Sequence, residues 1–180
     1  MNVLLVGFKP FASHDRNPSG EVLSSPKLQK HAVKLLPVSY QGVAEEMPKA
    51  LENKPDLTIV MNLTPFREDI VLEQYAYNEM KSVQPDEEGV SKNGEIIVPG
   101  GTPSYVSSLD IPAVQQFLAR SGINSVISLD PGRFVCNEAA YLSFHAGVPT
   151  VLVHLPLLED MSLEEDVEAI EAIIEYFSYL

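Results

Sequence analysis

The sequence has one cysteine, no tryptophan and few basic residues. Because Cys136 has no second cysteine to pair with, neither an internal disulfide nor a Cys–Cys zinc pair is possible. The 12 Lys and Arg residues against 25 Asp and Glu residues give a net charge of −13, and they form no basic cluster. A nucleic-acid backbone or an anionic membrane needs such a cluster to bind, so we expect neither partner.

Long apolar runs are also missing from the sequence. No stretch approaches the ~20 apolar residues that span a bilayer. The first apolar run, residues 3–6, has the length of a strand, and Lys9-Pro10 follows it in place of a small-residue cleavage site. We therefore predict a soluble, cytoplasmic protein. With 180 residues, 45% of them hydrophobic, the chain fits one compact domain, residues 1–180.

Short apolar runs alternate with helical patterns from one end of the chain to the other. This alternation predicts an α/β fold, a single-domain three-layer α/β/α sandwich around a mixed, mostly parallel sheet. Asn17, Asp110 and Ser162 are expected N-caps, the last in a capping box with Glu165. Extended segments are expected at residues 3–6, 32–36, 57–61, 70–77, 125–129 and 150–153, and helices at residues 18–25, 43–51, between 110 and 122, 134–145 and from 162 onward.

The segment from residue 79 to residue 108 is rich in Pro, Gly, Ser and charged residues. A loop or hairpin of this length in a compact domain is usually functional or forms an interface. Its acidic residues Asp86, Glu87 and Glu88 are interpreted as solvated surface carboxylates and not as a cation site. We predict no metal and no cofactor.

Cys136 and His154 are the two candidates for a reactive pair. Cys136 follows the strand predicted at residues 125–129, and His154 follows the strand predicted at residues 150–153. A helical crossover between them predicts parallel strands whose carboxyl ends share one edge of the sheet, where ligands bind in open α/β sheets. The two side chains are then close enough to touch. A buried structural cysteine and a structural histidine are the alternatives.

A thiol at this position has a physical route to reactivity. The helix N-terminus and a neighbouring imidazolium both favour its thiolate, and Arg133 would add positive potential if it pointed inward. Backbone N–H groups of residues 132–136 would bind a developing oxyanion. His154 would then give its proton to a leaving amine. The pattern predicts nucleophilic catalysis by Cys136.

Further motifs follow one another along the chain in the order of a known family. They are Gly7-Phe8-Lys9-Pro10-Phe11, Asn17-Pro18-Ser19, Leu36-Pro37-Val38, Arg67, Glu73 within residues 72–78, residues 85–89 and 99–109, Phe134-Val135-Cys136-Asn137, His154-Leu155-Pro156 and Met161-Ser162-Leu163-Glu164. Each motif is weak alone, but together they cover nearly the whole chain. In these motifs the sequence resembles the pyroglutamyl peptidase I (pyrrolidone carboxyl peptidase) family of cysteine peptidases.

This resemblance implies a phosphorylase/hydrolase-like fold and a specific reaction. Cys136 would attack the amide that links an N-terminal pyroglutamyl residue to the rest of a peptide, His154 would activate the thiol, and Glu73 would orient the imidazole. No metal or cofactor is required. Because family members commonly assemble as tetramers, the resemblance also implies a homo-oligomer, a tetramer or a dimer, with residues 79–108 as the candidate interface.

The resemblance further implies where the substrate binds. The lactam ring of pyroglutamate is uncharged and favours an apolar pocket with few polar contacts. Ordinary core packing of Phe8 and Phe11 and a solvent-facing Glu73 are the alternatives to these roles. The residues implied to bind the substrate are Phe8, Phe11, Asn17, Arg67 and Phe134.

Two turns depart from the family pattern. Residues 62–66 replace a Gly-rich turn, and residues 129–133 replace a small polar stretch before the cysteine. Pro131 lacks an N–H donor, and Asp130 would oppose a thiolate if it faced the site. Two alternatives therefore stay open. One is a hydrolase of the same fold that acts on another small N-acyl or lactam substrate, and the other is a weakly active or inactive homologue that only binds its ligand.

Overall fold

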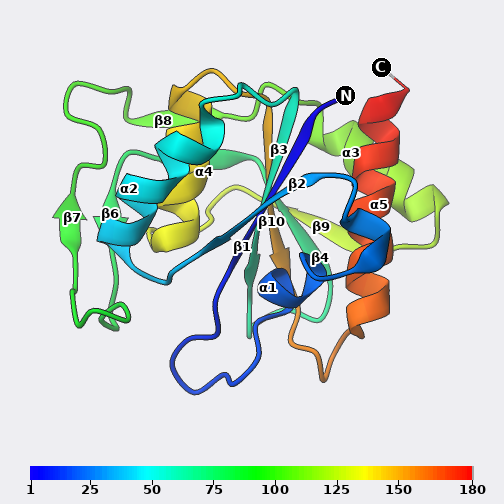
Figure 1. Ribbon diagram of the computed structural model, residues 1–180, viewed down its shortest axis with the longest axis horizontal. Helices are drawn as coiled ribbons and strands as arrows, with labels where there is room; N and C mark the ends of the chain where they lie inside the picture. The colour runs from blue at the N-terminus through cyan, green and yellow to red at the C-terminus, as the bar shows by residue number, and fades with distance from the viewer. Residues whose placement is uncertain (180) are drawn as a thin grey trace.

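The structure, a computed structural model, describes residues 1–179 of the 180-residue chain. Strands and helices alternate along it (Figure 1). The strands are β1 (Val3–Phe8), β2 (Ala32–Leu36), β3 (Leu57–Leu63), β4 (Ile70–Glu73), β5 (Tyr75–Tyr77), β6 (Met80–Lys81), β7 (Asn93–Glu95), β8 (Ser104–Val106), β9 (Ser125–Ser128) and β10 (Thr150–Leu155). The helices are α1 (Pro18–Val22), α2 (Tyr40–Leu51), α3 (Ile111–Arg120), α4 (Val135–His145) and α5 (Leu163–Ser178), with a short 3₁₀ turn at Pro26–Leu28. Among residues 1–179, every helix is too short or too polar to span a bilayer.

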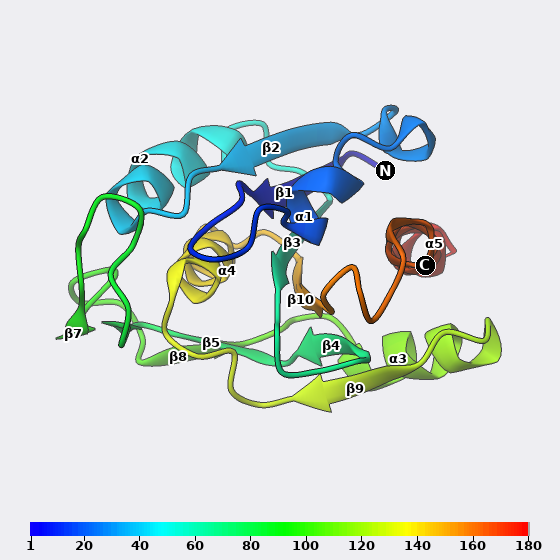
Figure 2. The same cartoon turned by 90° about the horizontal axis from the view of Figure 1, so that it is seen from below.

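A six-stranded sheet lies at the centre, in the order β2-β1-β3-β10-β4-β9. Strands β2, β1, β3 and β10 run parallel to one another, whereas β4 is antiparallel to β10 and parallel to β9. Helices α2 and α4 pack on one face of the sheet, and α1, α3 and α5 pack on the other (Figures 1 and 2). The α/β/α sandwich with a mixed, mostly parallel sheet is therefore confirmed.

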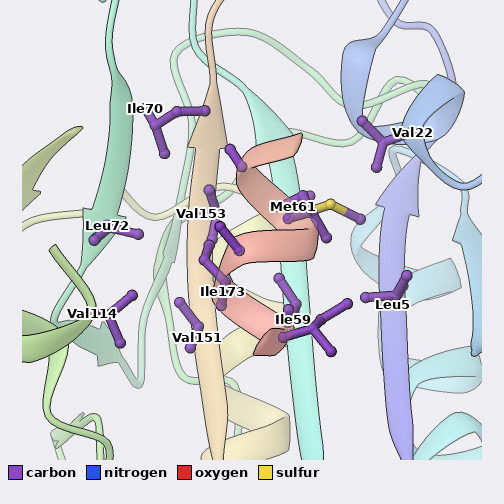
Figure 3. Close-up of a cluster of buried hydrophobic side chains, with 14 of the residues drawn as sticks. Leu5, Val22, Ile59, Met61, Ile70, Leu72, Val114, Val151, Val153 and Ile173 are labelled. Atoms are coloured by element: carbon purple, nitrogen blue, oxygen red, sulfur yellow. The ribbon is translucent and has the colours of Figure 1, made fainter. Parts of the chain in front are cut away.

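Each face of the sheet has its own hydrophobic core, because successive side chains of a strand point to opposite faces. Leu5, Ile59 and Val153 belong to the cluster covered by α1, α3 and α5 (Figure 3). Val60 and Leu152 belong to the cluster covered by α2 and α4. This second face carries the polar groups that lie near the carboxyl ends of β3 and β10.

Strands β9 and β10 do not run in the same direction, although the sequence predicts that they do. Strand β4 lies between them, and they run in opposite directions. The connection from β3 to β4 spans only residues 64–69, and a parallel crossover needs about a dozen residues or more. The chain therefore returns antiparallel in β4, and β9 follows in the direction of β4 through the α3 crossover. The predicted parallel crossover from β9 to β10 is wrong.

The predicted helix caps are confirmed. The side chains of Asn17, Asp110 and Ser162 accept backbone N–H groups at the starts of α1, α3 and α5. Ser162 and Glu165 form the expected capping box, which satisfies two backbone donors at once. Helix α1 ends at Val22 and is shorter than predicted. Local sequence signals thus place the helix starts well.

Helix α2 and strand β10 are among the elements that are longer than predicted. Helix α2 begins at Tyr40 instead of residue 43, since the Ser39 hydroxyl caps it. Strand β10 continues to Leu155 instead of ending at residue 153. His154 therefore lies inside the strand, where its backbone is fixed by pairing on both sides. A residue held in this way has little freedom to move away from its neighbours.

Residues 79–108 lie beside α2 and α4, with the β6–β7 ribbon at the outer end (Figures 1 and 2). Asp86 ties this segment to α2. It is 4% exposed, and its carboxylate accepts the N–H groups of Tyr40 at 3.0 Å and of Val90 at 2.9 Å. A carboxylate is favourable at a helix N-terminus. The prediction that these acids are solvated is wrong for Asp86, because backbone N–H groups of α2 and of its own loop replace water.

Glu138 is a second buried carboxylate next to this segment. It lies on α4, it is 2% exposed, and its Oε2 has no hydrogen-bond partner among the described residues. Burial raises its pKa to about 8, with Lys92 acting against the shift and Asp86 adding to it. A pKa above the unfolded value means that the folded state binds the proton more tightly. Glu138 therefore stabilises the fold fully only below about pH 4.5, and this contribution is lost as the pH rises to about 8.

Replacing this carboxylate with an amide tests its charge. We expect Glu138→Gln to have a larger free energy of unfolding than the wild type at pH 9, by about 2–4 kcal/mol. The two proteins should differ little at pH 4, where Glu138 is protonated in both states. Urea unfolding at several pH values measures the difference. Glu168→Gln, an exposed carboxylate on α5, is the control, and a difference for Glu138→Gln that did not grow with pH would contradict the interpretation.

Candidate active site

A thiol, an imidazole and a carboxylate form a connected chain. Cys136 Sγ lies 3.4 Å from His154 Nε2, and His154 Nδ1 lies 2.9 Å from Glu73 Oε1. All three residues are buried, with 3%, 8% and 3% of Cys136, His154 and Glu73 exposed. The predicted contact between Cys136 and His154 is confirmed, and a solvent-facing Glu73 is excluded by its burial.

The strand register explains how the imidazole meets the carboxylate. His154 in β10 pairs with Val71 of β4, and Leu152 pairs with Glu73. Alternate residues of a strand share a face, so His154 and Glu73 project from the same side of neighbouring strands. Cys136 lies in the first turn of α4, which packs on that side. The thiol thus approaches the imidazole from the helix layer and not from the end of a parallel strand.

Each member of the pair shifts the titration of the other. Burial raises the pKa of the Cys136 thiol, but the charge and hydrogen bond of His154, together with Asn62 and the Asn137 backbone, outweigh it, and the pKa is lowered. Burial lowers the pKa of His154, but the Cys136 thiolate and then Glu73 raise it to about 10. The N-terminus of α4 also favours a negative sulfur. Between the two pKa values, the pair exists as thiolate and imidazolium.

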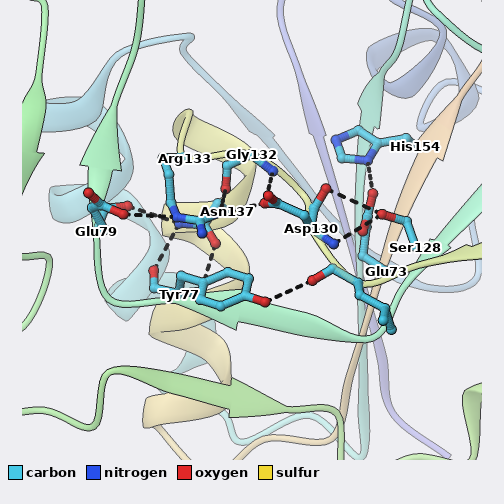
Figure 4. A network of polar contacts seen from close by, with 10 residues as sticks. Glu73, Tyr77, Glu79, Ser128, Asp130, Gly132, Arg133, Asn137 and His154 are labelled. Atoms are coloured by element: carbon cyan, nitrogen blue, oxygen red, sulfur yellow. Dashed lines mark hydrogen bonds and ion pairs between the residues drawn. The ribbon is translucent and has the colours of Figure 1, made fainter.

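Arg133 takes part in a separate network at the rim of the site. Its guanidinium bonds to Glu79 at 3.1 Å and to Asp130 at 2.5 Å, and it lies 3.8 Å from the centre of the Tyr77 ring (Figure 4). Two carboxylates therefore neutralise its charge, and the inward orientation that would place it beside Cys136 is not observed. The same pairing keeps Asp130 from opposing the thiolate.

A cavity of about 420 Å³ opens beside Cys136 and His154. It is lined by Phe134 and by residues 62–67 and 130–132, so both turns that depart from the family pattern form its walls. The volume is that of a small-molecule site. Within residues 1–179, no group of three or more His, Cys, Asp and Glu side chains is arranged to hold a metal ion.

Of the predicted aromatic wall, Phe134 lines the cavity, and Phe11 packs against Phe134 without lining the cavity itself. Their ring centroids are 5.7 Å apart, and the Tyr40 ring packs edge-on against Phe134 at 5.5 Å. Phe8 is fully buried in the core cluster of this face, and it does not line the cavity. Of the three rings only Phe134 lines the cavity, and the roles of Phe8, Phe11 and Phe134 in binding substrate stay predictions.

Asn17 and Arg67 reach the site in different ways. Arg67 is exposed and lines the cavity directly. Asn17 is buried and comes close because α1 packs tightly on β1 at Gly7, where a Cβ atom would lie 2.3 Å from the Ser19 carbonyl oxygen. Its amide then donates to Asn62 Oδ1 at 3.4 Å. Asn17 thus contacts a residue of the cavity wall and does not line the cavity itself.

Asn62 and Asn137 belong to the site but were not among the residues predicted for it. Asn137 accepts the Tyr77 N–H at 2.8 Å and donates to the carbonyl oxygens of Tyr77 at 2.9 Å and Glu79 at 3.1 Å. It ties the first turn of α4 to the strand that leaves Glu73. Its place next to Cys136 was an available signal. For Asn62, the signal was a polar residue directly after the apolar run of β3.

A model of one protein family matches residues 1–178, and the family is described as pyroglutamyl peptidase. The chain belongs to the pyroglutamyl peptidase family. Members of this family are cysteine peptidases, so the resemblance carried by the sequence motifs is confirmed. The Cys136–His154 contact fits the thiol chemistry of a pyroglutamyl peptidase.

Relatives of this pyroglutamyl peptidase match nearly from end to end. The pyrrolidone-carboxylate peptidase of Thermococcus onnurineus is 34% identical, and the alignment covers 97% of this chain and 98% of that protein. The crystal structure of pyrrolidone carboxyl peptidase from Fervidobacterium islandicum AW-1 superposes with a TM-score of 0.92 at 29% identity, covering 99% of both chains. The structure of the Pyrococcus furiosus protein gives a TM-score of 0.90 at 32% identity, covering 98% of this chain and 97% of that one. Similarity therefore extends over the sheet, both helix layers and the site.

Proposed function

We propose that the chain hydrolyses the amide bond after an N-terminal pyroglutamyl residue of a peptide. Cys136 is the nucleophile, His154 is the general base and acid, and Glu73 orients and charges the imidazole. The observation that carries this proposal is the continuous chain of contacts from Cys136 through His154 to Glu73, at 3.4 Å and 2.9 Å, beside an open cavity. Membership of the pyroglutamyl peptidase family supports the same reaction.

The reaction begins with the thiolate. Cys136 Sγ adds to the carbonyl carbon of the pyroglutamyl residue, and the carbonyl oxygen becomes an oxyanion. Backbone N–H groups in the first turn of α4 lack intrahelical acceptors and are available to bind it. The imidazolium of His154 gives its Nε2 proton to the leaving amine as the C–N bond breaks, which leaves a thioester. Neutral His154 then takes a proton from water, and the hydroxide attacks the thioester and releases pyroglutamate and the thiolate.

The charges around the cavity support an uncharged substrate ring. Among the described carboxylates that line it, Glu73 is bonded to His154 and Asp130 is bonded to Arg133. Each carboxylate already has a cationic partner, so neither offers an uncompensated charge to the ammonium group of an ordinary peptide N-terminus. A lactam nitrogen carries no charge and needs no such partner, because only an ionised group pays a large desolvation cost without one. Phe134 supplies an apolar surface for the ring.

A pair of matched substrates tests the proposed specificity. A prolyl aryl amide has the same five-membered ring as a pyroglutamyl aryl amide, but its ring nitrogen is charged. We expect kcat/KM to favour the pyroglutamyl amide by at least about 100-fold. Fluorescence of the released aryl amine measures both rates. A preference for the prolyl amide, or for another N-acyl amide in the same panel, would show instead that the altered turns at 62–66 and 129–133 have changed the substrate.

We also propose that copies of the chain assemble into a homo-oligomer, a tetramer or a dimer, in the cytoplasm. Exposed apolar side chains in residues 79–108 support this segment as the interface, because burial in an interface would remove their apolar surface from water. These side chains are Val83, Val90, Ile96 and Val106. Light scattering on the purified protein reports the number of copies.

A further inference from the structure

We propose that Asn62 binds the Cys136 thiolate through its side-chain amide and so holds the nucleophile in place and in its reactive form. This inference rests on the proposed role of Cys136. Asn62 of β3 pairs in register with His154 of β10, so the two side chains leave the sheet on the same face. Asn62, His154 and Cys136 all line the same cavity. The amide therefore faces the reacting sulfur from the strand next to the imidazole.

Two donors determine which end of the amide meets the sulfur. The Leu63 N–H donates to Asn62 Oδ1 at 2.9 Å, and Asn17 Nδ2 donates to the same oxygen at 3.4 Å. With its oxygen engaged, the amide presents its NH₂ group to Cys136. Burial raises the pKa of the thiol, whereas the His154 imidazolium and then the neighbouring Asn62 amide lower it. Hydrogen bonds to a charged acceptor are stronger than neutral ones.

Asn17 gives this arrangement a fixed support in α1. Its Oδ1 accepts the Ser19 N–H at 3.1 Å and the Ser19 hydroxyl at 2.8 Å, as the N-cap of the helix. Its Nδ2 is therefore turned toward Asn62 and toward the Lys9 carbonyl oxygen at 3.2 Å. The cap of α1, the end of β3 and the start of α4 are joined through these two amides. Asn17 acts in this network as a positioning residue for Asn62.

The pH dependence of Cys136 alkylation tests the role of Asn62. Iodoacetamide reports the thiolate directly, and Cys136 is the only cysteine. Asn62→Asp keeps the shape and the accepting oxygen but replaces the donor with a carboxylate, and Asn62→Ala removes the whole amide. We expect the thiol pKa to rise in Asn62→Ala, which only loses the donor, and to rise further in Asn62→Asp, by about one unit or more, because the carboxylate adds a negative charge. We expect kcat/KM on a pyroglutamyl amide near neutral pH to fall about tenfold in Asn62→Ala and further in Asn62→Asp, mainly through kcat.

Thr58→Val is the matched control. Thr58 lies on the same strand and face, four residues earlier, and its buried hydroxyl has no partner among the described residues. Its alkylation profile should equal that of the wild type. The inference is overturned if the folded Asn62 variants alkylate with the wild-type profile, even if they lose activity, because such a loss reflects packing alone. Asn62→Ala decides the outcome, because the carboxylate in Asn62→Asp raises the thiol pKa through its charge alone. Asn62→Gly takes its place if Asn62→Ala does not fold.

The same measurements separate this inference from the proposed function. If the wild type fails to cleave pyroglutamyl amides but the Asn62 variants still shift the thiol pKa upward, the role of Asn62 stands and the proposed reaction falls. If the wild type cleaves them and the profiles coincide, only the role of Asn62 falls.

Discussion

Replacing Glu73 with glutamine should lower kcat/KM on a pyroglutamyl aryl amide by a factor on the order of 10³–10⁴, the size of loss seen when a buried carboxylate behind a catalytic histidine is neutralised. Glutamine keeps the shape of the side chain but not its charge. His154 is 8% exposed, and Glu73 Oε1 is 2.9 Å from its Nδ1. Without the carboxylate, a buried imidazolium has lost one of its two negative neighbours. The thiolate–imidazolium pair then reverts toward neutral thiol and neutral imidazole.

The pH–rate profile of Glu73→Gln should narrow for the same reason. In the wild type, activity rises as the thiol with its lowered pKa ionises, and it falls as His154 loses its proton near pH 10. Removing Glu73 lowers the pKa of His154, so the alkaline limb moves to lower pH. Because the protonated form of His154 is then less stable, it also lowers the thiol pKa less. The acid limb therefore moves to higher pH.

Glu79→Gln is the matched control for the loss of one negative charge near the site. Glu79 bonds to Arg133 at the rim, 3.1 Å from its Nε (Figure 4). We expect this variant to keep kcat/KM and the shape of the pH profile. If Glu73→Gln behaved like Glu79→Gln, Glu73 would have no part in charging the imidazole.

Replacing Cys136 with serine should abolish hydrolysis, with kcat lower by at least about 10⁴-fold. The change is nearly isosteric, so the cavity and the contact with His154 should persist. A serine hydroxyl has a far higher pKa than a thiol, however, and an imidazole tuned to pair with a thiolate cannot ionise it. The loss therefore belongs to the chemical step and not to binding.

Binding separates this outcome from the alternative of a homologue that only binds its ligand. We expect Cys136→Ser to bind a pyroglutamyl peptide with a Kd close to the KM of the wild type. Calorimetry measures this Kd. If the wild type itself bound the peptide but did not cleave it, and Cys136→Ser bound it equally, the protein would be a binder. Cleavage by Cys136→Ser at the wild-type rate would exclude Cys136 as the nucleophile.

The sequence predicts the local parts of this fold well, because their signals are local. Apolar runs and caps such as Asn17 and Ser162 place strands and helix starts within a few residues. The places of Cys136 and His154 after two predicted strands predict their contact, and the order of motifs adds Glu73. The structure shows the three side chains in contact. Motif order is informative here because it identifies residues that are distant along the chain but belong to one site.

Other features that depend on non-local contacts are not predicted by the sequence. The direction of β9 follows from the short connection at residues 64–69, which reverses β4, and a strand pattern alone does not show which strands are neighbours. The burial of Asp86 depends on the N-terminus of α2, which is 46 residues away in sequence from its carboxylate. The position of Arg133 depends on two carboxylates, Glu79 and Asp130, which pair with its guanidinium and keep it away from the thiolate.

Trapping the covalent intermediate tests the central claim most directly. A pyroglutamyl aryl ester has a good leaving group, so formation of the thioester is fast and its hydrolysis limits turnover. Rapid acid quenching followed by mass spectrometry of the intact protein should show one added pyroglutamyl group, and peptide mapping should place it on Cys136. Turnover of the ester with no added mass, or with the group on another residue, would contradict a mechanism in which the Cys136 thiolate attacks the substrate.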